Sequence, residues 1–300
     1  MRLRCLLPLV LLTLLPASSA AAGGLPPTEA PAGRDGVVAP GGAVRFGALW
    51  TRHHTVITKT QIRGGRVLRG DALRGHWGIP VVANDWTSGG LSADGDTLVL
   101  VGAATAARPR RTTFAVFGTG KFALRRTITL QGKWTFDALS PDASTLYLIE
   151  SLDAKRSRYA VRAYDMRARR LLPDPVVDPS EPDESMRGQP VTRVTAPGGR
   201  WEYTLYAGGE HPFIHALDTV RRTSLCLDLP DRAARYPGRS RLALRRGRIQ
   251  VLHGDRVVAS APRRPQEASA GGGSPWALIA LALTGALVVA GGVRRALRAG

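Results

Sequence analysis

The sequence predicts an all-β protein, a β-propeller of about five four-stranded blades. One phrase, a turn followed by an apolar run, occurs at Gly90–Gly102 (GLSADGDTLVLVG) and again at Ala138–Glu150 (ALSPDASTLYLIE), with looser copies at 194–208 and 242–254. Each copy predicts a strand, a tight turn and a second strand. The runs TLVLV and TLYLI are apolar at successive positions, so such strands need cover on both faces. Blades stacked around an axis supply that cover.

A second phrase follows the first and completes each unit. It occurs at 56–70, 114–130, 159–173 and 213–229, for example as FAVFGTGKFALRRTITL and YAVRAYDMRARRLLP. This phrase also predicts strand, turn and strand, which gives four strands per unit at a spacing typical of propeller blades. We expect the propeller over residues 37–262, with blades that start near Val37, Pro80, Trp134, Pro190 and Tyr236. Short strands at regular spacing could also build a sandwich, and that alternative stays open.

The last predicted blade has three evident strands, RLALR, RIQVL and RVVAS. In many propellers the missing outer strand comes from the other end of the chain and locks the ring. Gly36–Ala39 is the segment available here. We therefore expect it to supply the outer strand of the last blade.

The first 22 residues predict a secretory signal peptide. Arg2 and Arg4 form a basic region, CLLPLVLLTLLP an apolar one, and Ala20–Ala22 a cleavage site. An uncleaved membrane helix is the alternative, which Pro8 and Pro16 disfavour. A flexible segment, residues 23–36, is expected between the signal and the propeller.

The C-terminal part predicts a single membrane span. Residues 276–293 are uncharged and would extend about 27 Å as a helix at ~1.5 Å per residue. A linker at 263–275 precedes the span, and a basic tail at 294–300 follows it, which favours a cytoplasmic tail and an outer location for the propeller. A buried core helix, or a sorting signal removed after export, are the alternatives. The predicted localisation is the cell membrane, with the main domain outside the cytoplasm.

The chain carries a formal charge of +19, of which five arginines lie in the end segments, leaving 19 − 5 = +14 for the rest. The basic residues are dispersed, so nucleic acid is a poor candidate partner. An anionic cell-envelope polymer, a lipid head group or a protein partner fits better. A high-GC genome explains the excess of arginine over lysine equally well.

Few residues suggest chemistry. Cys226 is the one thiol of the chain after the signal peptide, and a buried inert role is expected for it. His211 and His215 would lie about 13 Å apart in a strand, too far to share a metal ion. We expect no metal, no cofactor and no catalytic constellation recognisable from spacing.

SPDASTLYLI and its partner SADGDTLVLV resemble the repeats of YVTN-type β-propellers, a superfamily with surface-layer proteins and lactonase-like enzymes. The wider pattern FDALSPDASTLYLIES, YAVRAYDM, MRGQPVTR and FIHALDT is similar to a group of uncharacterised exported, membrane-anchored proteins of high-GC bacteria. The resemblance implies a fold and no activity. Five units are fewer than the seven usual in the superfamily, and no catalytic position of the lactonase-like enzymes matches a residue of this chain.

The predicted function is a membrane-anchored extracytoplasmic recognition or scaffold module. A lactonase-like or other hydrolase, with a site assembled from several blades at the channel mouth, is the alternative. The connection Gly75–Gly89 is expected at the rim of the channel because it joins two blades. It carries two tryptophans flanked by polar groups, which suit a carbohydrate or another small amphipathic ligand, although both indoles could instead pack as core. The candidate ligand-binding residues are His76, Trp77, Asn84, Asp85 and Trp86, with Arg187 on a second rim segment.

Overall fold

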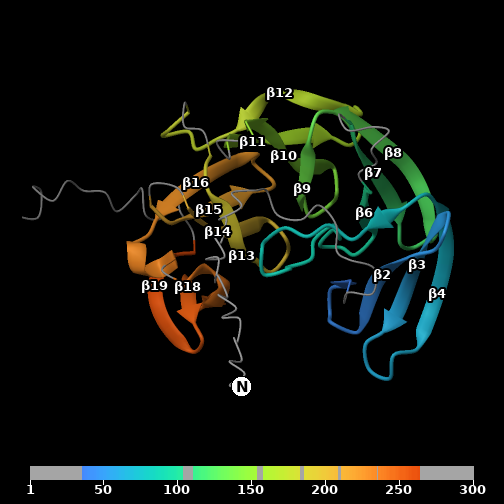
Figure 1. Cartoon of the computed structure of the whole chain (residues 1–300), viewed down its shortest axis with the longest axis horizontal. Coiled ribbons are helices and arrows are strands. Elements are labelled where there is room, and N and C mark those ends of the chain that lie inside the picture. The colour runs from blue at the N-terminus through green and yellow to red at the C-terminus, as the bar shows by residue number, and fades with distance from the viewer. Residues whose placement is uncertain are drawn as a thin grey trace, which may run out of the picture.

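The computed structural model describes residues 36–103, 111–153, 158–182, 186–208, 211–234 and 236–263. They form five antiparallel sheets that follow one another along the chain and around an arc (Figure 1). The all-β prediction and the number of units are confirmed. The sheets begin at Val37, Trp77, Trp134, Gln189 and Ser240, within a few residues of the predicted starts.

Each sheet is a meander of consecutive strands. The first contains β1 (Val37–Val38), β2 (Val44–Trp50), β3 (His54–Gln61) and β4 (Val67–Arg74), and the second β5 (Trp77–Gly78), β6 (Thr97–Gly102), β7 (Arg111–Gly118) and β8 (Ala123–Gln131). The third contains β9 (Trp134–Leu139), β10 (Thr145–Asp153), β11 (Arg158–Asp165) and β12 (Arg170–Val176), and the fourth β13 (Gln189–Thr195), β14 (Trp201–Ala207), β15 (Phe213–Asp218) and β16 (Thr223–Asp228). Two short 3₁₀ turns, η1 (Asp231–Ala234) and η2 (Pro237–Arg239), lead to the fifth sheet of β17 (Ser240–Arg245), β18 (Arg248–His253) and β19 (Arg256–Pro262).

The apolar runs are covered on both faces, as their pattern predicts. On β6, Val99 and Val101 pack in one core cluster with side chains of the third sheet such as Leu148. The alternate residues Leu98 and Leu100 pack in a different cluster, with side chains of the first sheet. One strand thus contributes to two interfaces between sheets, which is the stacking that a propeller requires.

The repeated turn phrase has a physical basis in one hydrogen-bond pattern. In both copies the serine hydroxyl accepts a hydrogen bond from the amide N–H of the threonine that opens the next strand. The same hydroxyl donates a hydrogen bond to an aspartate within the turn. That aspartate also accepts a hydrogen bond from a backbone N–H of the turn. The residues are Ser92, Asp94 and Thr97 in the second sheet and Ser140, Asp142 and Thr145 in the third. The Ser–x–Asp spacing therefore specifies the hairpin that leads from the innermost strand to the next one.

The expected closure of the ring by Gly36–Ala39 is wrong. Val37 and Val38 of β1 pair with Phe46 and Arg45 of β2, so they form the innermost strand of the first sheet. Within the described residues the fifth sheet keeps three strands, and it shares none with the first sheet. The physical reason is that Val37 lies in the apolar core beside Phe46 and Ile57, so the segment is held where its side chain is buried.

The second sheet contains an unexpected detour within its innermost strand. Trp77 and Gly78 pair with one end of β6, and Leu91 pairs with Leu98 at the other end. The ten residues between, Pro80–Gly89, leave the sheet as a small hairpin, which we call the strap. Its tip reaches β13, where Asn84 N–H donates to Pro190 O at 2.9 Å and Asp85 N–H to Val191 O at 3.2 Å (Figure 1). The strap thus joins the second sheet to the fourth across the middle of the molecule.

The part of the chain that the structure describes contains no helix long and apolar enough to cross a membrane. The predicted signal peptide, residues 1–22, and the predicted span, residues 276–293, lie outside the described residues.

Candidate ligand site in the central cavity

A cavity of about 330 Å³ lies between the innermost strands of the first four sheets. It is bounded by β1 and the turn after it, the strap and the turn at Ser92–Ala93, β9, and the β13–β14 hairpin. Three of its lining residues are charged: Asp137 on β9, Arg193 on β13 and Glu202 on β14. The cavity is therefore assembled from four separate parts of the chain.

Arg193 and Asp137 form a buried ion pair between the third and fourth sheets. The Arg193 Nη2 contacts Asp137 Oδ1, Nη1 donates to the Asp137 backbone oxygen, and Nε donates to Thr204 Oγ1 at 2.8 Å. All three guanidinium nitrogens are thus engaged by protein groups. The pair holds two sheets in register, and each charge neutralises the other.

The second carboxylate oxygen of Asp137 is not part of the ion pair. Its Oδ2 is buried and has no hydrogen-bond partner among the described residues. Oδ1 is therefore committed to Arg193, and Oδ2 would meet a substrate only after the atoms that bury it have moved. The role of Asp137 is to balance Arg193.

Glu202 differs from Asp137 because it forms no ion pair with any of the described residues. Its Oε2 accepts a hydrogen bond from Thr195 Oγ1 at 2.7 Å. Burial raises the pKa of Glu202 to about 7, although Arg193 and the Thr195 hydroxyl pull it down. At neutral pH this carboxyl is therefore close to half-protonated, and it can donate or accept a hydrogen bond at the cavity wall.

His215 lies behind this wall, on β15 opposite Thr204. Burial lowers the pKa of His215 to about 4, more than the nearby Asp137 charge raises it. Its Nε2 is buried without a hydrogen-bond partner among the described residues. His215 borders a smaller cavity of about 160 Å³ instead, together with Asp178 and Cys226. It is neutral at pH 7 and does not reach the central cavity.

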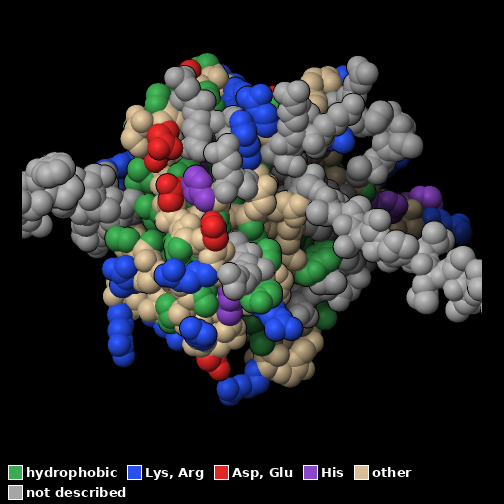
Figure 2. Space-filling view, turned by 60° about the vertical axis from the view of Figure 1, so that its left-hand side comes forward, with side chains coloured by type: hydrophobic (Ala, Val, Ile, Leu, Met, Phe, Trp, Pro, Cys, Tyr) green, Lys and Arg blue, Asp and Glu red, His purple; other side chains and the backbone are tan. Residues whose placement is uncertain are grey.

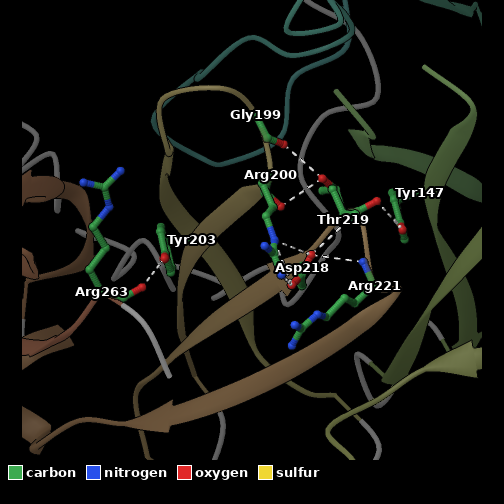
Figure 3. Close-up of polar contacts among 9 residues, drawn as sticks. Tyr147, Gly199, Arg200, Tyr203, Asp218, Thr219, Arg221 and Arg263 are labelled. Carbon is green, nitrogen blue, oxygen red and sulfur yellow. Dashed lines mark hydrogen bonds and ion pairs between the residues drawn. The ribbon is translucent and has the colours of Figure 1, made fainter. Parts of the chain in front are cut away.

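A second polar contact fixes the third sheet against the fourth (Figure 3). The hydroxyl of Tyr147 on β10 donates to Thr219 O at 2.8 Å, and the Thr219 hydroxyl donates to Gly199 O and Arg200 O. Asp218 beside it accepts from Arg200 and from the amides of residues 220 and 221. Burial opposes ionisation of Asp218, but these hydrogen bonds outweigh it and hold its pKa below the usual value. The β13–β14 hairpin, which carries Arg193 and Glu202, is therefore held by the ion pair with Asp137 and by the hydrogen bonds of Thr219 and Asp218 to its turn.

Both ends of the cavity are narrowed by turns and loops. Gly199 in the β13–β14 hairpin approaches Ala93 of the second sheet so closely that a Cβ on Gly199 would lie 2.6 Å from the Ala93 Cβ. The strap contributes Val82, Thr87, Ser88 and Gly89 to the wall. The connection Gly75–Gly89, predicted at the rim of the channel, thus lines the cavity with some of its residues, while its tip crosses to β13.

The predicted ligand residues separate into two groups. His76 and Trp77 lie where the first sheet meets the second: the His76 ring stacks on Trp50 with ring centroids 5.2 Å apart, and the Trp77 indole donates to Arg74 O at 2.8 Å. Trp77 is partly buried against the core of the first two sheets. This group is a candidate surface separate from the central cavity.

Asn84, Asp85 and Trp86 form the tip of the strap. Asn84 and Asp85 border a third cavity, of about 340 Å³, with residues of the fourth sheet such as Gln189 and with residues 237 and 238 of η2. Trp86 is 38% exposed and has a positive φ of 68°. Arg187, two residues before Gln189, is exposed, and its backbone oxygen accepts a hydrogen bond from the Tyr159 hydroxyl. The structure therefore brings Asn84 and Asp85 to the fourth sheet, away from His76 and Trp77, and ligand binding by all six residues stays a prediction.

Sequence reasoning missed the three charged residues of the central cavity. The signal that could have found them is a charged residue inside a strand-like run. Asp137 in TFDAL and Glu202 in WEYTLY have apolar or aromatic neighbours on both sides, and Arg193 in VTRVT lies among β-branched residues. Charged groups are rarely buried unless they are paired or functional.

Among the described residues, no group of three or more His, Cys, Asp or Glu side chains is placed to hold a metal ion. Cys226 lies on β16 and is partly exposed, so the expected full burial of this thiol is wrong. Its backbone N–H donates to Asp178 Oδ2 at 3.1 Å.

Comparison with known proteins gives distant similarities in structure alone. No family model and no curated protein matches the chain. Among solved structures, hydrazine synthase of Kuenenia stuttgartiensis is similar over 72% of this chain and 54% of its own, with 15% identity and a TM-score of 0.42. The Dos1 propeller has 8% identity and a TM-score of 0.40 over 75% of this chain and 56% of its own. The β-propeller domain of the Trilobed protease from Pyrococcus furiosus has 14% identity and a TM-score of 0.32 over 52% and 44%. The chain thus spans about half the length of these solved chains, two of which are named as propellers.

Proposed function

We propose that this protein is a recognition module of the cell envelope, which binds a small polar ligand in its central cavity. The observation that supports this most is the cavity of about 330 Å³, walled by four sheets and lined by the ion pair and by Glu202. Its volume falls in the range of ~300–1,000 Å³ typical of small-molecule sites. Sheets packed around the cavity keep such a site pre-formed, which lowers the entropic cost of binding.

The hydrolase alternative draws its support from the pair of carboxylates. Glu202, with a pKa near 7, suits a general acid, and Asp137 would be the second carboxyl group of the pair. Against this, Asp137 is held by Arg193 on one oxygen and buried on the other. A two-carboxylate mechanism needs both groups in contact with the substrate. Binding without turnover is therefore the better-supported function.

Binding in the cavity is testable with a variant that fills it. Ala39 lines the cavity beside β1 and is partly exposed, so Ala39→Trp places an indole in the ligand's space with little strain. We expect soluble muropeptides to bind the purified full-length protein in detergent with saturation, and Ala39→Trp to weaken binding at least tenfold, as measured by calorimetry. Leu124→Trp, on the exposed edge strand β8, is the matched control and keeps wild-type affinity. Equal affinity in all three proteins would place the site elsewhere, and muropeptide cleavage seen by mass spectrometry would favour the hydrolase.

We further propose that the propeller is tethered outside the cytoplasm by the segment at 276–293. The support is its uncharged sequence and the arginines that follow it. Protease added to spheroplasts should digest the propeller and leave a short C-terminal fragment, which an epitope at residue 300 would reveal on a blot. A propeller that resists digestion until the membrane is dissolved would refute the outer location.

An anionic envelope polymer remains a candidate partner for the outer surface. On the face shown in Figure 2, Lys and Arg side chains are scattered among acidic and apolar ones and form no continuous patch. Scattered charges favour weak, salt-sensitive attraction over a defined site. This supports the central cavity as the place of specific recognition.

A further inference from the structure

We propose that the ligand of the central cavity carries an ammonium group and that Glu202 is its counter-ion. This inference rests on the proposed function of the cavity and adds the chemical class of the ligand. It follows from the charges of the wall, the engagement of Arg193 and the aromatic ring beside the site.

The charge balance of the wall is the first step. Asp137, Arg193 and Glu202 are the charged residues among those that line the cavity in the described part of the chain. Asp137 and Arg193 cancel one another through their ion pair. The remaining charge is that of Glu202, so the wall is neutral when Glu202 is protonated and carries one negative charge when it is ionised.

The second step excludes the opposite choice, an anionic ligand. Each guanidinium nitrogen of Arg193 already donates to Asp137 or Thr204. The second N–H of each Nη remains for a ligand carboxylate, but such a carboxylate would share Arg193 with Asp137 and would be repelled by its like charge. It would also face Glu202. A cation meets neither obstacle.

The surroundings of Glu202 define what a ligand would meet there. Glu202 on β14 is paired with Thr195 on β13 and with Leu217 on β15. The charged groups that act on it are Arg193 and, across from β9, Asp137. His215 on β15 is neutral because burial lowers its pKa to about 4. The Thr195 hydroxyl occupies Oε2. An incoming ammonium would therefore bind at Oε1 and restore the charged form that burial disfavours.

Phe136 contributes the third step. It lines the same cavity from β9, and its ring is so close to the strap that a Cβ on Gly89 would lie 2.8 Å from Phe136 Cε1. Aromatic faces attract ammonium groups, most strongly where water is excluded. The positive net charge of the chain opposes a cationic ligand only weakly, because salt screens exposed charges beyond about 8 Å.

The experiment compares three probes of similar size that differ in charge: ethanolamine, 1,3-propanediol and glycolate. Their binding to the full-length protein is measured by NMR titration at pH 5, 6, 7 and 8. We expect ethanolamine to bind and the other two to bind at least tenfold more weakly. Because the cation favours ionised Glu202, the affinity for ethanolamine should fall by about tenfold per pH unit below pH 7 and level off above it.

Glu202→Gln keeps the shape of the protonated side chain and removes its charge. We expect this variant to fold, to lose the preference for ethanolamine and to lose the pH dependence. Triglycine amide and its N-acetylated form distinguish the source of the amine: tighter binding of the free peptide than of ethanolamine indicates a peptide amino terminus, and the reverse a small free amine.

The outcomes distinguish a failure of the ammonium-ligand inference from a failure of the proposed function, which is ligand binding in the central cavity. Ethanolamine binding that Ala39→Trp abolishes and Glu202→Gln leaves unchanged would overturn the role of Glu202. Stronger binding of glycolate or 1,3-propanediol, still sensitive to Ala39→Trp, would overturn the ligand class and keep the cavity as the site. Binding of muropeptides and probes that is insensitive to Ala39→Trp would overturn the proposed function itself.

Discussion

Individual charged residues inside apolar strands define the site of this protein. Glu202 and His215 are both buried, and burial moves their pKa values in opposite directions, to about 7 and about 4. Their positions in the sequence looked like ordinary strand residues. Their strands could be predicted from the repeat, but their convergence could not, because it depends on how separate sheets face each other.

The raised pKa of Glu202 gives its folding contribution a defined pH dependence. Between about pH 4.5 and 7 the folded protein holds a proton that the unfolded chain has released, so this group stabilises the fold less and less as the pH rises through that range. Glu202→Gln removes the effect. We expect the stability of the variant relative to the wild type to increase by about 2–3 kcal/mol between pH 5 and 8, at ~1.4 kcal/mol per pKa unit.

Urea denaturation at four pH values measures this difference. His215 works in the opposite sense, since its depressed pKa supplies stability above about pH 6.5 that is lost as the pH falls through 4. Both proteins contain His215, so its contribution cancels in the comparison. Glu181→Gln, at an exposed position, is the control and should run parallel to the wild type. A Glu202→Gln curve that also runs parallel would show that Glu202 is ionised in the folded state.

At the scale of elements, the strap is the feature that the repeat did not predict. The turn phrases specify hairpins because Ser, Asp and Thr recur at fixed spacing. The strap lies outside the repeat, and its partner, the free edge of β13, is about a hundred residues away. The local sequence of the strap does not indicate a pairing with so distant a strand. Its apolar residues Val81 and Val82 explain its burial but not its direction.

Asp85 shapes the tip of the strap. Its Oδ1 accepts hydrogen bonds from the amide of Thr87 at 3.0 Å and from the Thr87 hydroxyl at 2.6 Å. We expect Asp85→Ala to lower the free energy of unfolding by about 1 kcal/mol, since two hydrogen bonds of a turn are lost at an exposed site. Hydrogen exchange should accelerate at the amides of Asn84 and Asp85, which bond to β13. Asp255→Ala, in the exposed turn between β18 and β19, should change neither quantity, and unchanged exchange in Asp85→Ala would show that the strap does not depend on this turn.

The molecule as a whole is a row of five sheets whose ends are not joined through a shared strand. The repeat phrases predicted the number of sheets and their approximate starts. The closure was mispredicted because a two-residue strand such as β1 can pair with any free edge, and burial of Val37 against Phe46 decides which.

Deletion of residues 36–39 tests the observed pairing of β1 with β2. We expect faster hydrogen exchange along β2, which loses its neighbour, while β19 keeps the exchange of the wild type. Loss of protection in β19 with β2 unaffected would instead support a strand exchanged between the ends. Deletion of four residues from the exposed turn at 63–66 is the control for chain shortening.

The strap also determines how the molecule would respond to a pulling force applied at its two ends. In a ring locked by a shared strand, tension acts on that strand first and shears its whole ladder at once. Here the first and the fifth sheet can unfold separately under force, because they share no strand. The second, third and fourth sheets stay connected, because the hydrogen bonds from Asn84 and Asp85 to β13 join the second sheet to the fourth. Extension should therefore proceed in at least two steps of unequal resistance, with the segment that encloses the central cavity yielding last.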